Sequence, residues 1–477
     1  MAILVLEAST SAAKAMIYDQ EKGALNLITR MYPGNISDVV TIDPEAMIDL
    51  VLDVGREAAA GYNIEVIAVN CTWHSLLILD SQMKPKSRIM TWAYREAASI
   101  AQSIRDDETL TRSLFHETGC MVHAMYPLYK LIMMQKQGLI QPTDMIVDQG
   151  SYLYYRLTGE LMASASLVSG TALMNTHSLG WNERSLEMAG VKVNQLPIIR
   201  KFAKSDAYAP LSGQAASSLN IRAGIPVGLP YPDGSMNQVG SGALTPGIMT
   251  LSVGTSGALR VTSPTPILPQ NPGTWCYYAP DRYICGAATN GATNCVDWFK
   301  ASFTPTMSYK DMDLMVLDAD YSHMPTFLPF LFGERCPGWQ DARRGGFVGL
   351  TGTHRIPELY TAMLEGILFN LYQCYEILVT AAQAPHEIRI SGGINNSKIW
   401  LKMAADLWNQ PLRVAKSSQA SLMGGAAMGL AALGVISEPA DFKGDHGYPS
   451  EPDQQNAPRI RERYEQYLRY YREGGKA

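Results

Sequence analysis

Two short stretches of this chain present hydroxyl groups in turns that carry few other side chains. Thr10-Ser11 in "LEASTSAAKAM" and Thr255-Ser256 in "LSVGTSGALRV" each lie between two apolar runs, and the two stretches align without a gap. This pattern predicts two β-hairpins whose bare tips let a ligand approach the backbone. Hydroxyls and main-chain N–H groups at such tips, including the N–H of Gly254, are suited to phosphoryl oxygens.

A third small-residue turn has a different setting. "ISGGINNSK" places Gly392-Gly393 between a predicted strand and a predicted helix, where N–H groups and the helix dipole favour an anion. The sequence contains no G-x-x-x-x-G-K-[ST] loop and no G-x-G-x-x-G after a strand. A P-loop or Rossmann nucleotide site is therefore not expected.

Phosphoryl transfer to an alcohol also needs a base and a carboxylate that can serve magnesium. Asp233 in "GLPYPDGSMNQVGSGAL" follows a proline and precedes a small-residue segment that reads as a helix. From local sequence alone, forming a turn is the more common role for such an aspartate. Glu7 interrupts an apolar strand, where a carboxylate is paired, holds a cation or lies on an exposed face.

Strand patterns alternate with helical patterns along the 477 residues, as in a strand at 66–73 and a helix at 95–119. Such alternation predicts an α/β protein, and the length predicts two domains. A Thr-Pro-Gly turn at 245–247 favours a boundary that gives domains of 1–243 and 244–477. Each domain then opens on one of the matching hairpins. We expect a duplicated unit facing itself across a cleft, the alternative being a chance similarity of composition.

Composition excludes several classes of protein. The 39 basic and 44 acidic side chains give a net charge of −5, which argues against nucleic acid as the main partner. The sequence contains no run of 18 apolar residues, so no membrane span is expected. The N-terminus lacks the pattern of a secretory signal. Seven cysteines without a C-x-x-C pair argue against a disulfide framework or a zinc cluster. We therefore expect a cytoplasmic protein.

Longer motifs resemble a known family. "GGFVGLTGTHRIPELYTAMLE" (345–365), the Gly-Glu-Arg-x-Pro segment at 333–337 and "ASLMGGAAMGLAALG" (420–434) are similar to segments of the FGGY carbohydrate kinases. "MYPLYKLIMM" (125–134) follows another signature, except that Met133 stands where tryptophan is usual. The resemblance spans nearly the whole chain. It implies the fold of the actin-like and hexokinase-like (ribonuclease H-like) superfamily, with two duplicated ATPase domains.

The resemblance also implies a mechanism and its residues. Asp233 aligns with the catalytic base, ATP is the phosphoryl donor, and Mg²⁺ is held near Glu7, directly or through water. The residues implied for binding ATP are Thr10, Ser11, Lys14, Gly254, Thr255, Ser256, Gly392, Gly393 and Asn396. The first loop departs from the family, because Glu7 and Ser9 stand where Asp and Gly are usual.

Within the family, stretches such as "HSLLILD" and "SGTALMNTHSLGWNE" are most similar to the gluconate kinase subgroup. This implies transfer to the 6-hydroxyl of gluconate, with Asp233 at the sugar together with four further residues. Those four are His74, Ser75, Trp92 and Arg95.

Several alternatives stay open on the sugar side. Arg95 either pairs with a sugar-acid carboxylate or, with Glu96, starts a solvated helix, and Tyr94 stands where Asp is common. His74 either binds a substrate hydroxyl or is satisfied within the protein. The chain could also be an FGGY kinase for xylulose or another ketose or polyol, or a sugar- or nucleotide-binding homologue without catalysis. The oligomeric state is open, a homodimer being one arrangement.

Overall fold

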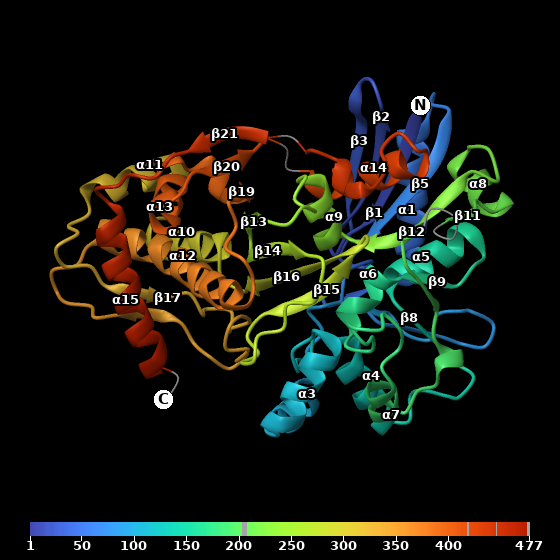
Figure 1. The fold of residues 1–477 in the computed structure, drawn as a ribbon, viewed down its shortest axis with the longest axis horizontal. Coiled ribbons are helices and arrows are strands. Elements are labelled where there is room, and N and C mark those ends of the chain that lie inside the picture. The colour runs from blue at the N-terminus through green and yellow to red at the C-terminus, as the bar shows by residue number, and fades with distance from the viewer. Residues whose placement is uncertain (203–207, 417–418, 445, 475–477) are drawn as a thin grey trace. The chain divides into compact units, whose positions relative to one another are not determined.

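The computed structural model describes residues 1–202, 208–416, 419–444 and 446–474. The chain forms two compact units, and the first of them includes two segments from the second half of the sequence (Figure 1). Unit 1 comprises Met1–Thr245, Ser263–Ile284 and Gln419–Gly444, and unit 2 comprises Pro246–Thr262, Cys285–Ser418 and Asp445–Ala477. Among the described residues, no helix combines the length and apolarity needed to cross a membrane.

The sheet of unit 1 contains the first predicted hairpin at its centre. The strand order is β11-β12-β5-β1-β2-β3. β1 pairs antiparallel with β2 and parallel with β5, and β5 pairs parallel with β12. The strands are β1 (Ala2–Ala8), β2 (Ala12–Asp19), β3 (Gly23–Met31), β5 (Ile64–Cys71), β11 (Tyr208–Pro210) and β12 (Pro226–Pro232).

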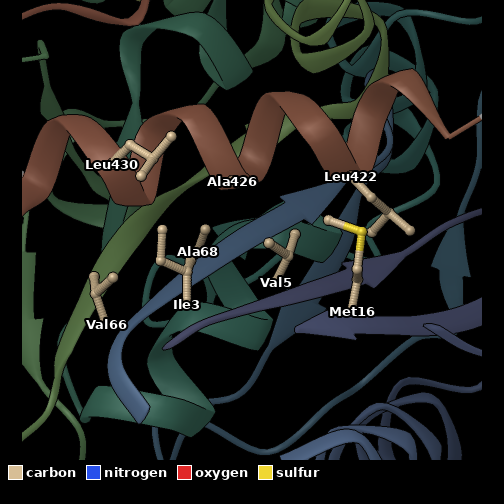
Figure 2. Close-up of a cluster of buried hydrophobic side chains, with 8 residues drawn as sticks. All are labelled: Ile3, Val5, Met16, Val66, Ala68, Leu422, Ala426 and Leu430. Atoms are coloured by element: carbon tan, nitrogen blue, oxygen red, sulfur yellow. The ribbon is translucent and has the colours of Figure 1, made fainter. Parts of the chain in front are cut away.

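Helices cover both faces of this sheet because the central strands are apolar on both sides. α1 (Pro44–Ala59) packs on β1–β3, and α5 (Gln149–Thr158) packs on β5 and β12. On the other face lies α14 (Ala420–Ala432), which comes from the far end of the sequence. Figure 2 shows Leu422, Ala426 and Leu430 of α14 above Ile3, Val5, Met16, Val66 and Ala68 of the sheet.

α14 also packs against α9 (Asp233–Gly240), the helix that begins at the predicted base. Small residues are needed there, since a Cβ on Gly240 would lie 1.8 Å from the main-chain oxygen of Ala420. On the sheet side, a Cβ on Gly425 would lie 2.5 Å from Val5 Cγ1. The small-residue composition of this segment therefore reflects close packing on two sides.

The sheet of unit 2 repeats the order of the first. Its strands run β15-β16-β14-β13-β19-β20-β21, so a hairpin is again followed by parallel neighbours. β15 and the start of β16 fall within the residue bounds of unit 1. The strands are β13 (Ile248–Val253), β14 (Gly257–Ser263), β15 (Trp275–Ala279), β16 (Arg282–Thr289), β19 (Glu387–Ser391), β20 (Leu412–Ala415) and β21 (His446–Ser450). This repetition confirms the predicted α/β fold with two duplicated units.

Four helices of unit 2 contribute residues to one pocket. They are α10 (Thr293–Phe303), α11 (Tyr309–Met315), α12 (Ile356–Ala381) and α13 (Lys398–Trp408). α15 (Ala457–Gly474) packs against α12 and α13. In unit 1, α4 (Pro127–Lys136) carries Lys130, which donates to the carbonyls of His74 and Thr91.

The single helix predicted for 95–119 is wrong. The structure has α2 (Ala98–Arg105) and α3 (Glu108–Thr118), separated at two consecutive aspartates. The side chain of Asp107 accepts a hydrogen bond from the N–H of Leu110 and so starts a new helix. The strand predicted at 66–73 runs instead from Ile64 to Cys71, which leaves Trp73 and His74 beyond its end.

Candidate functional site

The first hairpin tip is closed by its own hydroxyl. Ala8 pairs with Ala13, and between them the Ser9 hydroxyl donates to the Ala12 carbonyl at 2.8 Å. Ser9 does not adopt a positive φ. A serine is therefore compatible with this loop, although the family usually has glycine there.

Glu7 is buried and paired with Lys14, so it does not lie on an exposed face. Its side chain is 1% exposed, and Oε1 accepts a hydrogen bond from Lys14 Nζ at 2.8 Å. Asn70 Nδ2 lies 3.4 Å from the other oxygen, and Asn70 also donates to the carbonyl of Ser421 in the first turn of α14. Burial, and then the charge of Glu7, raise the pKa of Tyr32.

The residues near Glu7 fit a magnesium ion that is held partly by water and by a bound phosphate. Among the described residues, no group of three or more His, Cys, Asp or Glu side chains could hold a metal ion. Mg²⁺ keeps several waters and is commonly held by one or two carboxylates together with substrate phosphates. A lone buried carboxylate already bonded to Lys14 therefore suits an ion carried by the nucleotide and reached through water.

Asp233 lies at the same sheet edge as Glu7. Pro232 pairs with Cys71, and Glu7 pairs with Asn70, so β1, β5 and β12 reach this edge together. Asp233 begins α9 and is half-buried, with Oδ1 accepting from the N–H of Gly234 at 2.7 Å. The carboxyl ends of parallel strands are where α/β sheets usually bind ligands.

The sugar-side residues begin where β5 ends. The ring of Trp73 packs directly against the backbone at Gly234 and Gly170. A Cβ would lie 2.4 Å from the ring at Gly234 and 2.5 Å from it at Gly170, so both positions need glycine. His74 has φ +66° and its Nδ1 lies 2.6 Å from the carbonyl of Gly170. Since a carbonyl only accepts, Nδ1 is the donor, and in the neutral ring Nε2 is an acceptor. The protein thus fixes the orientation of the His74 ring through Nδ1.

The other predicted sugar residues differ in their surroundings. Ser75 is 1% exposed and its Oγ accepts from the N–H of Gln149, so it anchors α5. Trp92 is 37% exposed. Arg95 is half-buried and precedes the first turn of α2, so it does not start that helix. Tyr94, which stands where the family often has Asp, donates instead to Glu96 at 2.8 Å.

Three side chains at this site were missed by sequence reasoning. Gln149 Oε1 accepts from both the N–H and the hydroxyl of Thr72, which holds the end of β5. Lys130 is fully buried and donates to two main-chain carbonyls. Tyr277 packs on Trp73 with ring centroids 4.9 Å apart. Only Lys130 carried a visible signal, a charge within the apolar run 125–134.

The second hairpin, in unit 2, has a shorter tip than the first. Val253 pairs with Gly257, so Gly254, Thr255 and Ser256 form a loop that is one residue shorter than Ser9–Ala12. The gapless alignment of the two stretches is therefore wrong in their second strands. Thr255 and Ser256 are exposed at this tip.

The glycine turn at Gly392-Gly393 packs directly on the second hairpin. Gly392 has φ +101°, and a Cβ there would lie 2.4 Å from the carbonyl oxygen of Val253. The N–H of Thr293, at the start of α10, donates to the carbonyl of Gly254 at 2.8 Å. These contacts gather the hairpin, the glycine turn and a helix N-terminus within unit 2.

A pocket of about 550 Å³ opens beside this glycine turn. Its volume suits a small organic ligand. Within it, Tyr309 donates to Asp297 at 2.7 Å, and Tyr360 donates to Asp313 at 3.1 Å. The pocket is lined by Thr293, Val296, Asp297, Tyr309, Lys310, Asp313, Tyr360, Gly393, Asn396, Ser397 and Trp400.

Both halves of the chain match one protein family. Residues 2–240 match the N-terminal domain, and residues 249–433 the C-terminal domain, of the FGGY family of carbohydrate kinases. The gluconokinase of Bacillus subtilis is 25% identical over 454 residues, which cover 91% of this chain and 88% of the relative. The xylulose kinase of the same species is 24% identical over 449 residues, with 91% and 88% covered.

Two solved kinase structures have nearly the same fold as this chain. The xylulose kinase from Lactobacillus acidophilus has a TM-score of 0.93 and 26% identity, covering 98% of this chain and 97% of its own. The gluconate kinase from the same organism has a TM-score of 0.92 and 25% identity, with 98% of each chain covered. The chain is thus about equally similar to kinases named for two different sugars.

Proposed function

Because the chain belongs to the FGGY family of carbohydrate kinases, which are phosphotransferases with an alcohol group as acceptor, we propose that its acceptor is gluconate and its product 6-phosphogluconate. The observation that carries the proposal is the sheet edge of unit 1. There, Asp233 begins α9 beside Trp73, and the His74 ring is oriented by the hydrogen bond between its Nδ1 and the Gly170 carbonyl. The support for the choice of sugar is the similarity of stretches such as "HSLLILD" to gluconate kinases, since the gluconokinase and xylulose kinase relatives each match 91% of this chain.

In the proposed reaction, a carboxylate oxygen of Asp233 accepts the proton of the attacking hydroxyl. Thr10 and Ser11, at the first hairpin tip in unit 1, would donate to oxygens of the transferred phosphoryl group. Gly254, Thr255 and Ser256, at the second tip in unit 2, are proposed to bind the phosphates of the nucleotide. Phosphoryl transfer needs positioning and charge stabilisation more than covalent chemistry. Magnesium, when bound with the nucleotide, offsets phosphate charge. Glu7 would serve it through water, while Lys14 balances the charge of Glu7.

The nucleoside of ATP would occupy the 550 Å³ pocket of unit 2. Gly393 and Asn396, two of the residues expected to bind ATP, line it, which supports this proposal. The Tyr309 ring offers an aromatic surface for a base, and Asp297 and Asp313 offer acceptors for ribose hydroxyls or an exocyclic amine. The second hairpin lies next to this turn, so the phosphate chain would extend from the pocket toward Thr255.

Arg95 is the residue proposed to bind the carboxylate of gluconate. It lies on the same loop as Trp92, ahead of α2. Xylulose is the second candidate acceptor, because the xylulose kinase structure from Lactobacillus acidophilus matches as well as the gluconate kinase structure does. Xylulose has no carboxylate, so Arg95 would then have no counter-ion on the sugar.

The test measures ADP release at fixed Mg·ATP with gluconate, other aldonates, xylulose, glycerol and hexoses. Turnover with gluconate in preference to the other compounds supports the proposal, whereas preference for xylulose rejects gluconate. Asp233→Asn should lower kcat by about 10²- to 10⁴-fold while sugar binding persists by calorimetry. Asp281→Asn is the matched control, since Asp281 is an exposed turn residue with φ +56°, which asparagine tolerates. An unchanged kcat in Asp233→Asn would rule out its role as base.

A further inference from the structure

The indole of Trp92 is hydrogen-bonded to the first hairpin tip. Its Nε1 donates to Thr10 Oγ1 at 3.0 Å, although the two residues are 82 positions apart in the sequence. Trp92 is a predicted sugar residue and Thr10 a predicted phosphate residue. The only polar atom of the Trp92 side chain is therefore directed at the phosphate loop.

The loop that carries Trp92 is fixed by its neighbour Thr91, which is fully buried. The hydroxyl of Thr91 donates to the Val39 carbonyl at 2.6 Å, and its N–H donates to the Val40 carbonyl at 3.0 Å. Its own carbonyl accepts from Lys130 Nζ at 2.6 Å. The indole thus extends from a rigid backbone, and its N–H has a defined direction.

The backbone of Thr10 is fixed as well. Its carbonyl accepts from the Ser37 hydroxyl at 3.0 Å, and the Ser11 carbonyl accepts from the N–H of Tyr32 at 2.8 Å. A threonine hydroxyl has one proton and two lone pairs. An indole N–H can only donate, so it occupies a lone pair of Thr10 Oγ1, and the hydroxyl proton must point to some other acceptor.

We propose that Trp92 is a positioning residue for phosphoryl transfer, because it holds Thr10 Oγ1 so that the hydroxyl proton is directed at an oxygen of the transferred group. The inference rests on the proposed function in one respect, namely that Thr10 contacts that group. Trp92, a residue of the sugar side, then affects the chemical step. Its hydrogen bond to Thr10 links the sugar side to the phosphate loop within unit 1.

Kinetics distinguish this role from simple contact with the sugar. Trp92→Phe keeps an aromatic face and removes the N–H. If Trp92 acts through Thr10, kcat falls by about tenfold or more and the KM for the sugar stays within about twofold. If the indole N–H only binds sugar, the KM rises and kcat is preserved, which would overturn the inference.

A double-mutant cycle provides the decisive comparison. Thr10→Val should lower kcat, and adding Trp92→Phe to it should cost little more, since the bond is already lost. Thr10→Ser, which retains the hydroxyl, should keep most of the activity. Trp298→Phe, on α10 and outside the Trp92–Thr10 contact, is the control for replacing an indole, and circular dichroism checks that each variant folds.

The cycle uses whichever sugar the unmodified protein phosphorylates best. A failure of the gluconate proposal therefore appears as a different preferred sugar and leaves the cycle intact. Independent, multiplicative effects of the two substitutions would overturn the inference. An unchanged kcat in Thr10→Val would do the same, because Thr10 would then have no part in transfer.

Discussion

Gly424 of α14 and Met236 of α9 meet backbone to backbone, so that a Cβ on Gly424 would lie 2.0 Å from the Met236 carbonyl oxygen. α9 begins at Asp233, and α14 lies on the opposite side from α1 of the sheet that carries Glu7. A helix from the C-terminal part of the sequence therefore sets the position of the proposed base. Any side chain between the two helices would move Asp233 relative to β1 and β5.

Gly424→Ala is expected to destabilise the protein and to lower activity together. The obstructing atom is a backbone oxygen, which cannot rotate away, so we expect a loss of about 1–3 kcal/mol in unfolding free energy. Displacement of α9 should also lower kcat by about tenfold or more, because small misplacements of catalytic groups are costly. Urea denaturation and steady-state kinetics measure the two effects.

The control for this variant is Gly213→Ala. Gly213 is the first residue of α8 (Gly213–Leu219), and a Cβ there would have no heavy atom within 4 Å. Alanine should be neutral or slightly stabilising at that position. If Gly424→Ala behaves like Gly213→Ala, the contact between α9 and α14 does not position Asp233.

Much of the fold could be predicted because its signals are local. Apolar strands, bare hairpin tips and the small-residue segment at 420–434 identify elements without knowledge of their partners, and the FGGY resemblance and the kinase class are confirmed. The register of strand pairing in the hairpins could not be predicted from such local signals. The two hairpin sequences align without a gap, yet the tip of the second hairpin is one residue shorter than that of the first. Backbone hydrogen bonds pair Val253 with Gly257, whereas the alignment would pair Val253 with Ala258. The domain bounds 1–243 and 244–477, and the site roles, stay predictions.

The contacts that shape the sugar side join segments far apart in the sequence. Tyr277 reaches Trp73 because the segment Ser263–Ile284 belongs to unit 1. Asn70 bonds to the carbonyl of Ser421 across 351 positions. Neither local periodicity nor a motif contains such information, so residue types could be predicted for this site while their partners could not.

The buried amine of Lys130 joins two loops of the sugar side. Its Nζ donates to the carbonyls of His74 at 2.8 Å and Thr91 at 2.6 Å, and burial lowers its pKa. Lys130→Met fills similar space but removes the donor, at a cost of about 1–3 kcal/mol for each carbonyl left without it. Loosening of the His74 and Trp92 loops should raise the sugar KM more than the ATP KM. Denaturation and kinetics with each substrate varied test this expectation.

Lys136→Met is the matched variant on the same helix. Lys136 is exposed at the end of α4, so its loss should change the unfolding free energy by no more than about 0.5 kcal/mol. A Lys130→Met protein with lowered stability and unchanged sugar KM would show that Lys130 supports the fold without shaping the sugar side.

Asp148 should make stability depend on pH in an unusual direction. It caps α5, accepting from the N–H of Ser151 at 2.7 Å and from its hydroxyl at 2.8 Å. Burial nevertheless raises its pKa from 3.8 to about 6, with the Ser151 bonds opposing the shift. The folded protein then holds this proton more tightly than the unfolded chain. Its contribution to stability is fully present below pH 3.8 and is lost as the pH rises through about 6.

Asp148→Asn removes this titration and retains an acceptor for the cap. The unfolding free energy of the unmodified protein, relative to the variant, should therefore fall by about 2 kcal/mol between about pH 4 and pH 7 and then level off. Urea denaturation at half-unit pH steps measures the difference. Asp107→Asn, at the exposed cap of α3, is the matched variant for replacing a capping aspartate. A flat or rising difference for Asp148→Asn would mean that its carboxyl is charged in the folded protein throughout this range, and that the Ser151 bonds outweigh the cost of burial.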